Sequence, residues 1–286
     1  MVGLRGDLVR FAEDGGGGAS SRTEVDAVVS PAVGVVLGPW GATELFLNAG
    51  LGFHANDDGG VALGGGPSAP EPGDEDEISP LVRAAGVEAG ARTEVLPGVE
   101  SALSAWYLQS GSEVLFAGPE EAGELGRDSE RYGLRWTGAW AARDWLELDL
   151  ELALARARYR EPVDGGRVPG AVESSLGLGA TLHQGEERFL SLSGRLLGPR
   201  DLTGDGSERS GASLLVDLQG ALRLDGGWVL RAGLFNLLDQ DVSDVEEFDP
   251  FFAEGGFAGV GGGAFDELLA SPTDPFSVRV GLSGAF

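Results

Sequence analysis

The feature of this sequence that most constrains its fold is a strict alternation of apolar and polar residues. It is clearest at residues 146–155, where every even position is a leucine and Glu147, Asp149 and Glu151 lie between them. On an α-helix these leucines would spread around the circumference and bury no face, although Leu, Glu and Ala are good helix formers. On a strand they all point one way and the acids point the other. The pattern therefore predicts a β-strand.

The same alternation recurs along the chain and predicts twelve strands. They are expected near residues 2–12, 25–38, 42–52, 81–93, 99–117, 131–141, 145–158, 172–183, 188–197, 212–224, 228–235 and 275–286. We treat 99–117 as one long strand with an irregularity near Ser110 and Gly111. Most of these segments exceed the usual length of about 5–6 residues and match the roughly 9–11 residues that cross a bilayer at a tilt.

An alternating sheet fits two classes of protein, a soluble sandwich or a membrane barrel, and two features favour the barrel. The polar faces are unusually rich in Gly, Ser and Ala, which suit a crowded lumen. The connections alternate in length, with short turns such as 142–144 and 225–227 and long segments such as 53–80 and 236–274. Short periplasmic turns and long extracellular loops give this alternation. We therefore predict an all-β, antiparallel, up-and-down transmembrane β-barrel of about twelve strands.

Composition excludes several other classes. The formal charge is −26 and all the cationic side chains are Arg, which argues against a nucleic-acid partner and against docking on anionic lipid by a basic patch. The chain has no Cys and no run of about 18 apolar residues. It also has no N-terminal signal peptide. Because an outer-membrane protein must be exported, we expect the chain to be truncated at its N-terminus.

Several motifs, in this order, resemble those of TonB-dependent receptors. They are the strand-turn-strand of residues 30–40 and 43–57, the strand start Arg131-Tyr132-Gly133-Leu134, the segment Asn236-Leu237-Leu238-Asp239 before the last strand, and the closing strand Phe276 to Phe286. The resemblance covers nearly the whole chain. It identifies residues 1–286 as the C-terminal part of such a barrel, which makes the chain a fragment of a larger barrel.

The resemblance implies uptake of scarce ligands, such as ferric siderophores, cobalamin, other metal chelates or some glycans. It also implies a plugged barrel of about 22 strands. The expected partners are outer-membrane lipid, a small-molecule or metal-chelate ligand, and a TonB complex reached through an N-terminal part that this chain lacks. The expected location is the Gram-negative outer membrane, as an integral protein. A passive porin-like or structural barrel is the alternative, and no enzymatic activity is expected.

Candidate ligand-binding residues cluster where one predicted strand enters a long loop. They are His54, Asn56, Asp57 and Asp58, and a metal or chelate contact competes with a merely solvated loop. Segments 53–60 and 236–274 are the best candidates for ligand contact because loops this long are usually functional or disordered. The second histidine, His183, precedes a short turn and is expected to be incidental.

Neither the acidic run nor the glycine runs predict a binding site. The acidic run 74–77 lacks the spacing of a defined Ca²⁺ loop, and the glycine runs lack the strand, helix and Lys of a phosphate cradle. No catalytic residue, resident metal or cofactor is therefore expected. The acids Glu147, Asp149 and Glu151 mark either a cation path or simply a polar lumen. The terminal Phe286 is predicted to be an assembly signal, with an ordinary edge strand as the alternative.

Overall fold

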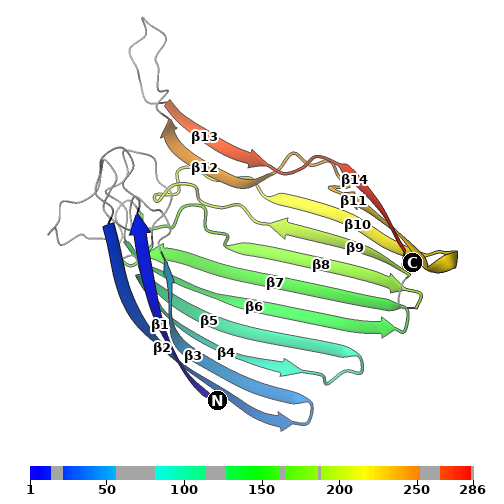
Figure 1. Cartoon of the computed structure of the whole chain (residues 1–286), viewed down its shortest axis with the longest axis horizontal. Helices are drawn as coiled ribbons and strands as arrows, with labels where there is room; N and C mark the ends of the chain where they lie inside the picture. The colour runs from blue at the N-terminus through cyan, green and yellow to red at the C-terminus, as the bar shows by residue number, and fades with distance from the viewer. Residues whose placement is uncertain are drawn as a thin grey trace, which may run out of the picture.

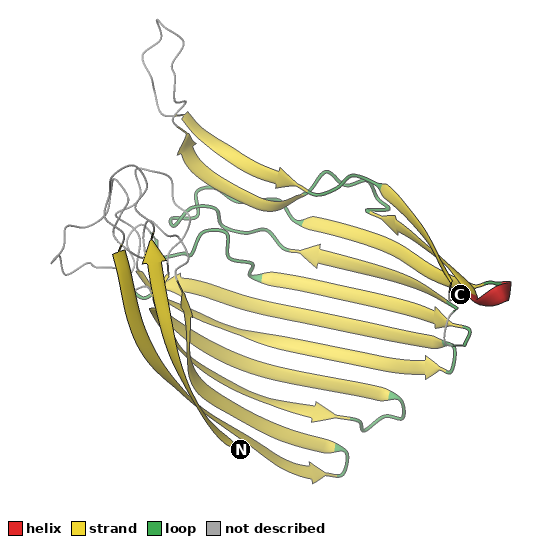
Figure 2. Ribbon diagram, in the orientation of Figure 1, coloured by secondary structure: helices red, strands yellow, loops and turns green. Residues whose placement is uncertain are grey.

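The computed structural model describes residues 1–13, 22–55, 81–113, 127–161, 165–185, 188–251 and 265–284. These residues form fourteen β-strands and one 3-10 turn, Asp225–Gly227 (Figure 2). The strands are β1 Val2–Glu13, β2 Arg22–Trp40, β3 Thr43–Ala55, β4 Leu81–Thr93, β5 Val99–Glu113, β6 Arg127–Arg143, β7 Leu146–Tyr159, β8 Ser174–His183, β9 Phe189–Leu197, β10 Ser213–Arg223, β11 Trp228–Phe235, β12 Ser243–Phe251, β13 Phe265–Pro272 and β14 Ser277–Gly284.

Twelve of these strands form one antiparallel sheet in sequential order, from β1 through β11 and then β14 (Figure 1). The predicted twelve-stranded, up-and-down sheet is therefore confirmed. The predicted irregularity in β5 is also present, because its register with β6 shifts between Ser110 and Glu113. Among the described residues β1 and β14 do not pair with each other, and the sheet is open.

Strands β12 and β13 form a separate two-stranded sheet inside the segment 236–274. The prediction that this segment is only a loop was wrong. The two strands contain Asp, Glu and Pro, which are depleted in strands, and their sequence does not alternate. Backbone pairing, which does not depend on side-chain type, makes this hairpin.

The connections have the predicted arrangement. Short turns join β2 to β3, β4 to β5, β6 to β7, β8 to β9 and β10 to β11 on one side of the sheet, and the strand ends that lead into the longer connections lie on the other (Figure 1). The N- and C-termini lie on the side of the short turns. Val2 pairs with Val33, so β1 begins part-way along β2.

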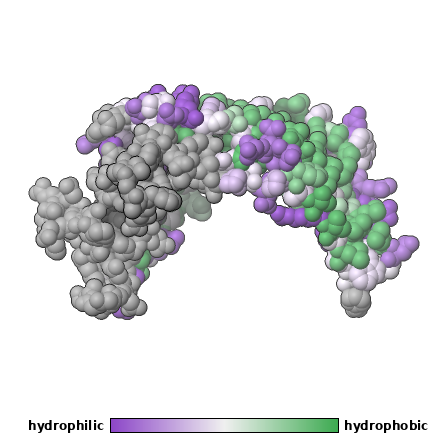
Figure 3. All heavy atoms as spheres, turned by 90° about the horizontal axis from the view of Figure 1, so that it is seen from above, coloured by the Kyte–Doolittle hydropathy of each residue, from purple (hydrophilic) through white to green (hydrophobic). Residues whose placement is uncertain are grey.

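The sheet is curved into an arch, and hydrophobic side chains gather on the outer surface of one limb (Figure 3). Register separates the two faces of β7. Glu151 pairs directly with Thr137, which lines a hollow on the concave face, so Glu147, Asp149 and Glu151 lie on that face. The five leucines of β7 lie on the convex face with Leu134, which pairs directly with Leu154. The leucines are thus placed where a barrel meets lipid.

Three glycines are covered by an aromatic ring on the directly opposed residue. The pairs are Phe46 with Gly90, Trp106 with Gly133, and Trp228 with Gly284. A Cβ at any of these glycines would meet the ring at or within about 3 Å. The ring occupies the space that the absent side chain leaves and shields the exposed backbone, which compensates for the poor strand propensity of glycine.

Few side chains are buried among the described residues, because both faces of one open sheet remain accessible. Val28, Leu81 and Val82 are buried in the sheet near its long-connection side, and Val168 and Leu202 are buried between two connections. Many of the large exposed hydrophobic side chains belong to the convex face, including Leu45, Leu103, Leu134 and Leu178. In water such a surface would promote aggregation, whereas in a bilayer it is covered by lipid.

Candidate functional site

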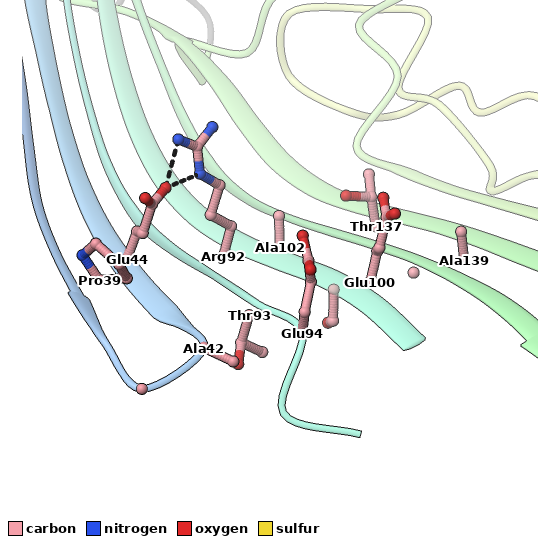
Figure 4. A pocket seen from close by; sticks show the side chains of 13 residues that line it. Pro39, Ala42, Glu44, Arg92, Thr93, Glu94, Glu100, Ala102, Thr137 and Ala139 are labelled. Atoms are coloured by element: carbon pink, nitrogen blue, oxygen red, sulfur yellow. Dashed lines mark hydrogen bonds and ion pairs between the residues drawn. The ribbon is translucent and has the colours of Figure 1, made fainter. Parts of the chain in front are cut away.

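The concave face carries a hollow of about 770 Å³ near the short turns (Figure 4). Glu44 and Arg92, directly opposed on β3 and β4, form an ion pair of 2.5 Å in it. Glu94 and Glu100 line the same hollow, and neither forms an ion pair with another of the described residues. Carboxylates in excess of guanidinium groups make this end of the concave face attractive to cations.

A second hollow, also of about 770 Å³, lies further from the short turns. Its floor includes Gly34, Gly50 and Gly86. Trp106 and Arg135 also line it. The three glycine positions of the lining therefore have no side chain of their own. In the sequence, the small residues on the polar face favoured a barrel lumen, and in the structure they line this hollow.

Polar side chains on the concave face are joined across strands. Arg135 pairs with Glu151 at 2.7 Å, and the amide of Asn48 lies 3.5 Å from the carboxylate of Glu88. The Asp149 carboxylate lies over Gly179, its directly opposed residue, in the space a Cβ would fill. These contacts hold the charged groups close to the sheet wall.

The two histidines differ in their surroundings. His183 Nε2 lies 3.4 Å from a Glu147 carboxylate oxygen beside the β6–β7 turn, so it has a partner that the sequence did not indicate. His54 is exposed near the end of β3, on the side of the long connections, as predicted. Asn56, Asp57 and Asp58 lie outside the described residues, as do the acidic run 74–77 and Phe286.

Two long connections, 160–173 and 198–212, dock on each other. The Arg167 guanidinium contacts Asp201 at 3.1 Å, and Arg209 contacts the same carboxylate oxygen at 2.8 Å. Backbone bonds run from Arg167 N to Gly204 O and from Gly170 N to Asp201 O. Asp201 is buried, with 8% of its side chain exposed. The two connections therefore form one packed unit at the long-connection end.

A tight turn caps this unit. The Asp205 carboxylate accepts hydrogen bonds from Ser207 N at 2.9 Å and from the Thr203 hydroxyl at 2.7 Å. These bonds favour the charged form and lower the pKa of Asp205 to about 2. The sequence did not predict this unit. The cluster of Thr, Gly, Asp and Ser at 203–207 is a turn signal, but it does not tell which other connection it contacts.

Within the described ranges, no group of three or more His, Asp or Glu side chains is arranged to hold a metal ion. In those same ranges, no helix has the length and apolar character needed to span a membrane.

Comparison with known proteins shows similarity in structure only. No family model matches the chain, and no curated protein matches it. The copper transporter OprC matches at 18% identity with a TM-score of 0.70, over 100% of this chain and 45% of its own. The ferric yersiniabactin uptake receptor FyuA from Yersinia pestis matches at 14% identity with a TM-score of 0.64, over 92% of this chain and 38% of its own. The ferric citrate transporter FecA matches at 13% identity with a TM-score of 0.68, over 98% of this chain and 41% of its own.

These structures are TonB-dependent receptors, and this chain has the fold of part of their outer-membrane β-barrel. The chain spans less than half the length of each of the three. At these identities the likeness concerns the fold, and the ligand of any one neighbour is a property of that neighbour.

Proposed function

We propose that residues 1–286 are the C-terminal barrel part of a TonB-dependent uptake receptor in the Gram-negative outer membrane. The observation that carries the proposal is the sheet itself. Twelve sequential antiparallel strands present leucines on the convex face and polar or small residues on the concave face, with the long connections on one side. In lipid, only a closed barrel pairs the backbone hydrogen-bonding groups of every strand, so we propose that this sheet is part of a larger ring.

The proposed cargo is a small metal chelate such as a ferric siderophore. Support comes from three neighbours named as a copper transporter, a ferric yersiniabactin receptor and a ferric citrate transporter. A TonB complex would supply the energy through a segment outside these 286 residues. The long connections would face the cell exterior, as they do in barrels of this type.

The proposed ligand contacts are His54, Asn56, Asp57 and Asp58, with the rest of 53–60 and the segment 236–274. The exposed position of His54, at the long-connection end of β3, supports this choice. The test is uptake of radiolabelled iron and copper chelates by cells that express the intact parent protein. Deleting both segments should abolish uptake while the barrel still assembles in the outer membrane. Undiminished uptake by the assembled deletion variant would place the ligand site elsewhere.

A passive, cation-selective barrel is the second candidate. Two carboxylates favour this candidate, Glu94 and Glu100. They line the hollow at the short-turn end and form no ion pair with another of the described residues. Planar-bilayer recordings of the intact parent separate the two candidates. A steady cation-selective conductance without ligand or energy supply would support the passive barrel, and a closed pore with energy-dependent uptake would support the receptor.

The terminal aromatic residue is proposed to act in assembly. Phe286 follows β14, whose convex-face residues Val278, Val280 and Leu282 are exposed. A terminal ring at the membrane interface is favoured there. Deleting Phe286 should leave exported protein in the periplasm while still permitting refolding in detergent. Normal insertion of the deletion variant in cells would refute this role.

A further inference from the structure

The hairpin of β12 and β13 does not continue the barrel sheet directly. β11 and β14 pair as far as Phe235 with Ser277. From there the chain enters the hairpin by an outgoing leg of seven residues, 236–242, and leaves it by a returning leg of four, 273–276. The three additional residues of the outgoing leg are accommodated at the base of the hairpin. This base therefore determines the direction in which the hairpin leaves the barrel, as a β-bulge does within a sheet.

The side chain of Asn236 joins the two legs. Its Nδ2 donates hydrogen bonds to the carbonyl of Gln240 at 2.9 Å and to the carbonyl of Asp274 at 3.3 Å. Its Oδ1 accepts a hydrogen bond from the amide of Gln240 at 2.9 Å. All three bonds form at once because an asparagine side chain offers two donor hydrogens and an acceptor oxygen. Asn236 is buried, with 4% of its surface exposed, so these bonds are shielded from water.

Two further residues tie the legs together. Asp239 Oδ1 accepts a hydrogen bond from the amide of Phe276 at 3.0 Å. The amide and the hydroxyl of Thr273 both donate to the carbonyl of Val242, at 2.9 Å and 3.1 Å. Hydrogen bonds therefore cross between the two legs from the barrel to the start of the hairpin.

The base is also attached to the barrel sheet and has an unusual backbone. The Asn236 amide donates to Asp217 Oδ1 on β10 at 2.9 Å, and the Leu237 amide donates to the carbonyl of Val216 at 2.8 Å. Asn236 and Asp239 have φ angles of 50° and 46°, and within the described ranges no other residue except glycine has a positive φ. Such a backbone persists only where surrounding contacts determine it, and it is frequent at functional positions.

We propose that Asn236 and Asp239 are positioning residues that hold the β12–β13 hairpin in one orientation at the long-connection end of the barrel. Figure 1 shows the hairpin extending from the ends of β11 and β14 that are remote from the short turns. This inference rests on the proposed function, because the hairpin belongs to a segment that is proposed to contact a metal chelate. A hairpin that is fixed beforehand loses less conformational freedom when the chelate binds, and this strengthens binding.

The orientation of the hairpin is tested by the distance between two spin labels. Asp225→Cys in an exposed short turn and Glu246→Cys in β12 provide the attachment sites, because these 286 residues contain no cysteine. In the intact parent protein in phospholipid vesicles, pulsed electron paramagnetic resonance should give one narrow distance distribution. Asn236→Asp should broaden it, because a carboxylate has no hydrogen to donate to the carbonyls of Gln240 and Asp274. An unchanged distribution would overturn the proposal.

Amide exchange measures the loosening of the base. The Thr273 amide donates to Val242 rather than to Asn236, so it reports the base as a whole. Its exchange should accelerate about tenfold in Asn236→Asp, the effect expected for the loss of a hydrogen bond at a buried group. Asn236→Gly should show the same effect without strain at the positive φ. The matched control is Asp241→Asn, an exposed side chain on the outgoing leg, and an equal effect in this control would contradict the assignment.

Asp239 provides an independent pair of variants. Asp239→Asn should behave like the wild type, because its amide oxygen still accepts from Phe276, whereas Asp239→Ala should broaden the distance distribution. Each variant is first shown to insert by its heat-modifiable migration. If Asn236→Asp does not insert, Asp239→Ala is measured in its place. Equal distributions for the two Asp239 variants would refute its positioning role.

Uptake kinetics separate positioning from assembly. The probes are radiolabelled ferric citrate and copper citrate, supplied to cells that express the intact parent protein. Asn236→Asp should raise the chelate concentration for half-maximal uptake by about tenfold and leave the maximal rate unchanged, because saturating chelate holds the hairpin in place. A lower maximal rate at an unchanged half-saturating concentration would show a role in assembly and overturn the proposal. A wild-type protein that takes up neither chelate would count against the proposed function alone, and the spin-label distances would still decide the positioning role.

Discussion

The depth of a charge on the convex face provides a quantitative prediction. Leu150 lies midway between Leu146 and Leu154, four residues from each. At about 3.3 Å per residue and a tilt of about 35–45°, it is about 10 Å in depth from either end of the leucine stretch. Leu150 should therefore lie near the middle of the bilayer, where lipid covers its side chain.

Leu150→Arg should destabilise the inserted barrel by about 2–4 kcal/mol, the cost of Arg at the bilayer midplane. This corresponds to a factor of about 30–900 in the folding equilibrium. Leu154→Arg should cost only about 0–1 kcal/mol, because near the interface the guanidinium reaches headgroups and water. Asp149→Asn should change stability by less than about 0.5 kcal/mol, since Asp149 faces the concave side and its amide analogue has the same shape.

The assay is equilibrium folding of the intact parent protein into phospholipid vesicles across a urea series, followed by the heat-modifiable mobility of the folded barrel. The three substitutions belong to one strand, so differences in strand propensity are small beside the depth effect. Equal costs for Leu150→Arg and Leu154→Arg would refute the membrane depth assigned to β7. A larger cost for Asp149→Asn than for Leu150→Arg would reverse the assigned faces.

Three further predictions concern single side chains. Arg167→Ala should loosen the docked connections by about 1–3 kcal/mol, because Asp201 is buried and keeps only Arg209. Faster amide exchange at Gly170, which donates to the Asp201 carbonyl, would report it, and unchanged exchange would show that the ion pair is dispensable. Because the pKa of Asp205 is lowered to about 2 from 3.8, its bonds stabilise the turn above pH 4 and are lost as the pH falls through about 2; exchange of the Ser207 amide should accelerate over that range, and an Asp205→Asn variant that kept the same acid transition would contradict this. Gly133→Ala should reduce vesicle folding by about 1–3 kcal/mol, since its Cβ would meet Trp106 and the Leu154 carbonyl, whereas Gly194→Ala, with open space around it, should be tolerated; equal effects would refute the role of the close approach.

Much of the sheet was predictable because the alternation of apolar and polar side chains determines which face each residue occupies, and this restricts the strand register. A slip of one residue in β7 would move its leucines to the concave face and its acids to the convex face, so the sequence encodes the register strongly. The alternation of short and long connections likewise follows from antiparallel neighbours. These two signals gave the number of strands, their order and the faces of β7.

The hairpin of β12 and β13 was not predictable for the opposite reason. Its backbone pairing leaves no periodic signature, because neither strand alternates apolar and polar residues. The docking of Arg167 on Asp201 was also not predictable, since these residues are 34 positions apart in sequence on two different connections. Contacts between loops depend on three-dimensional proximity that the barrel creates, and the local sequence contains only the turn signal.

Of the four candidate ligand residues, only His54 lies within the described residues, and its ligand role stays a prediction. His54 was expected at the entry to a long loop, and β3 does place it exposed at the long-connection end. The ion pairs of Glu44 with Arg92 and of Glu151 with Arg135 were not predicted. Each joins strands that are adjacent in the sheet, so a register assigned before the structure would have been needed to find them.

The most direct test of the central claim uses the absence of native cysteine in these 286 residues. Single cysteines placed at each position from 146 to 154 take a nitroxide spin label, and the protein is inserted into phospholipid vesicles. Collision rates with oxygen, which concentrates in lipid, and with a water-soluble nickel chelate are then measured by electron paramagnetic resonance. We expect alternation with a period of two, with even positions accessible to oxygen and odd positions accessible to nickel, and a maximum in oxygen access near 150. Access to the nickel chelate at even and odd positions alike, without that maximum, would contradict a membrane-spanning barrel strand.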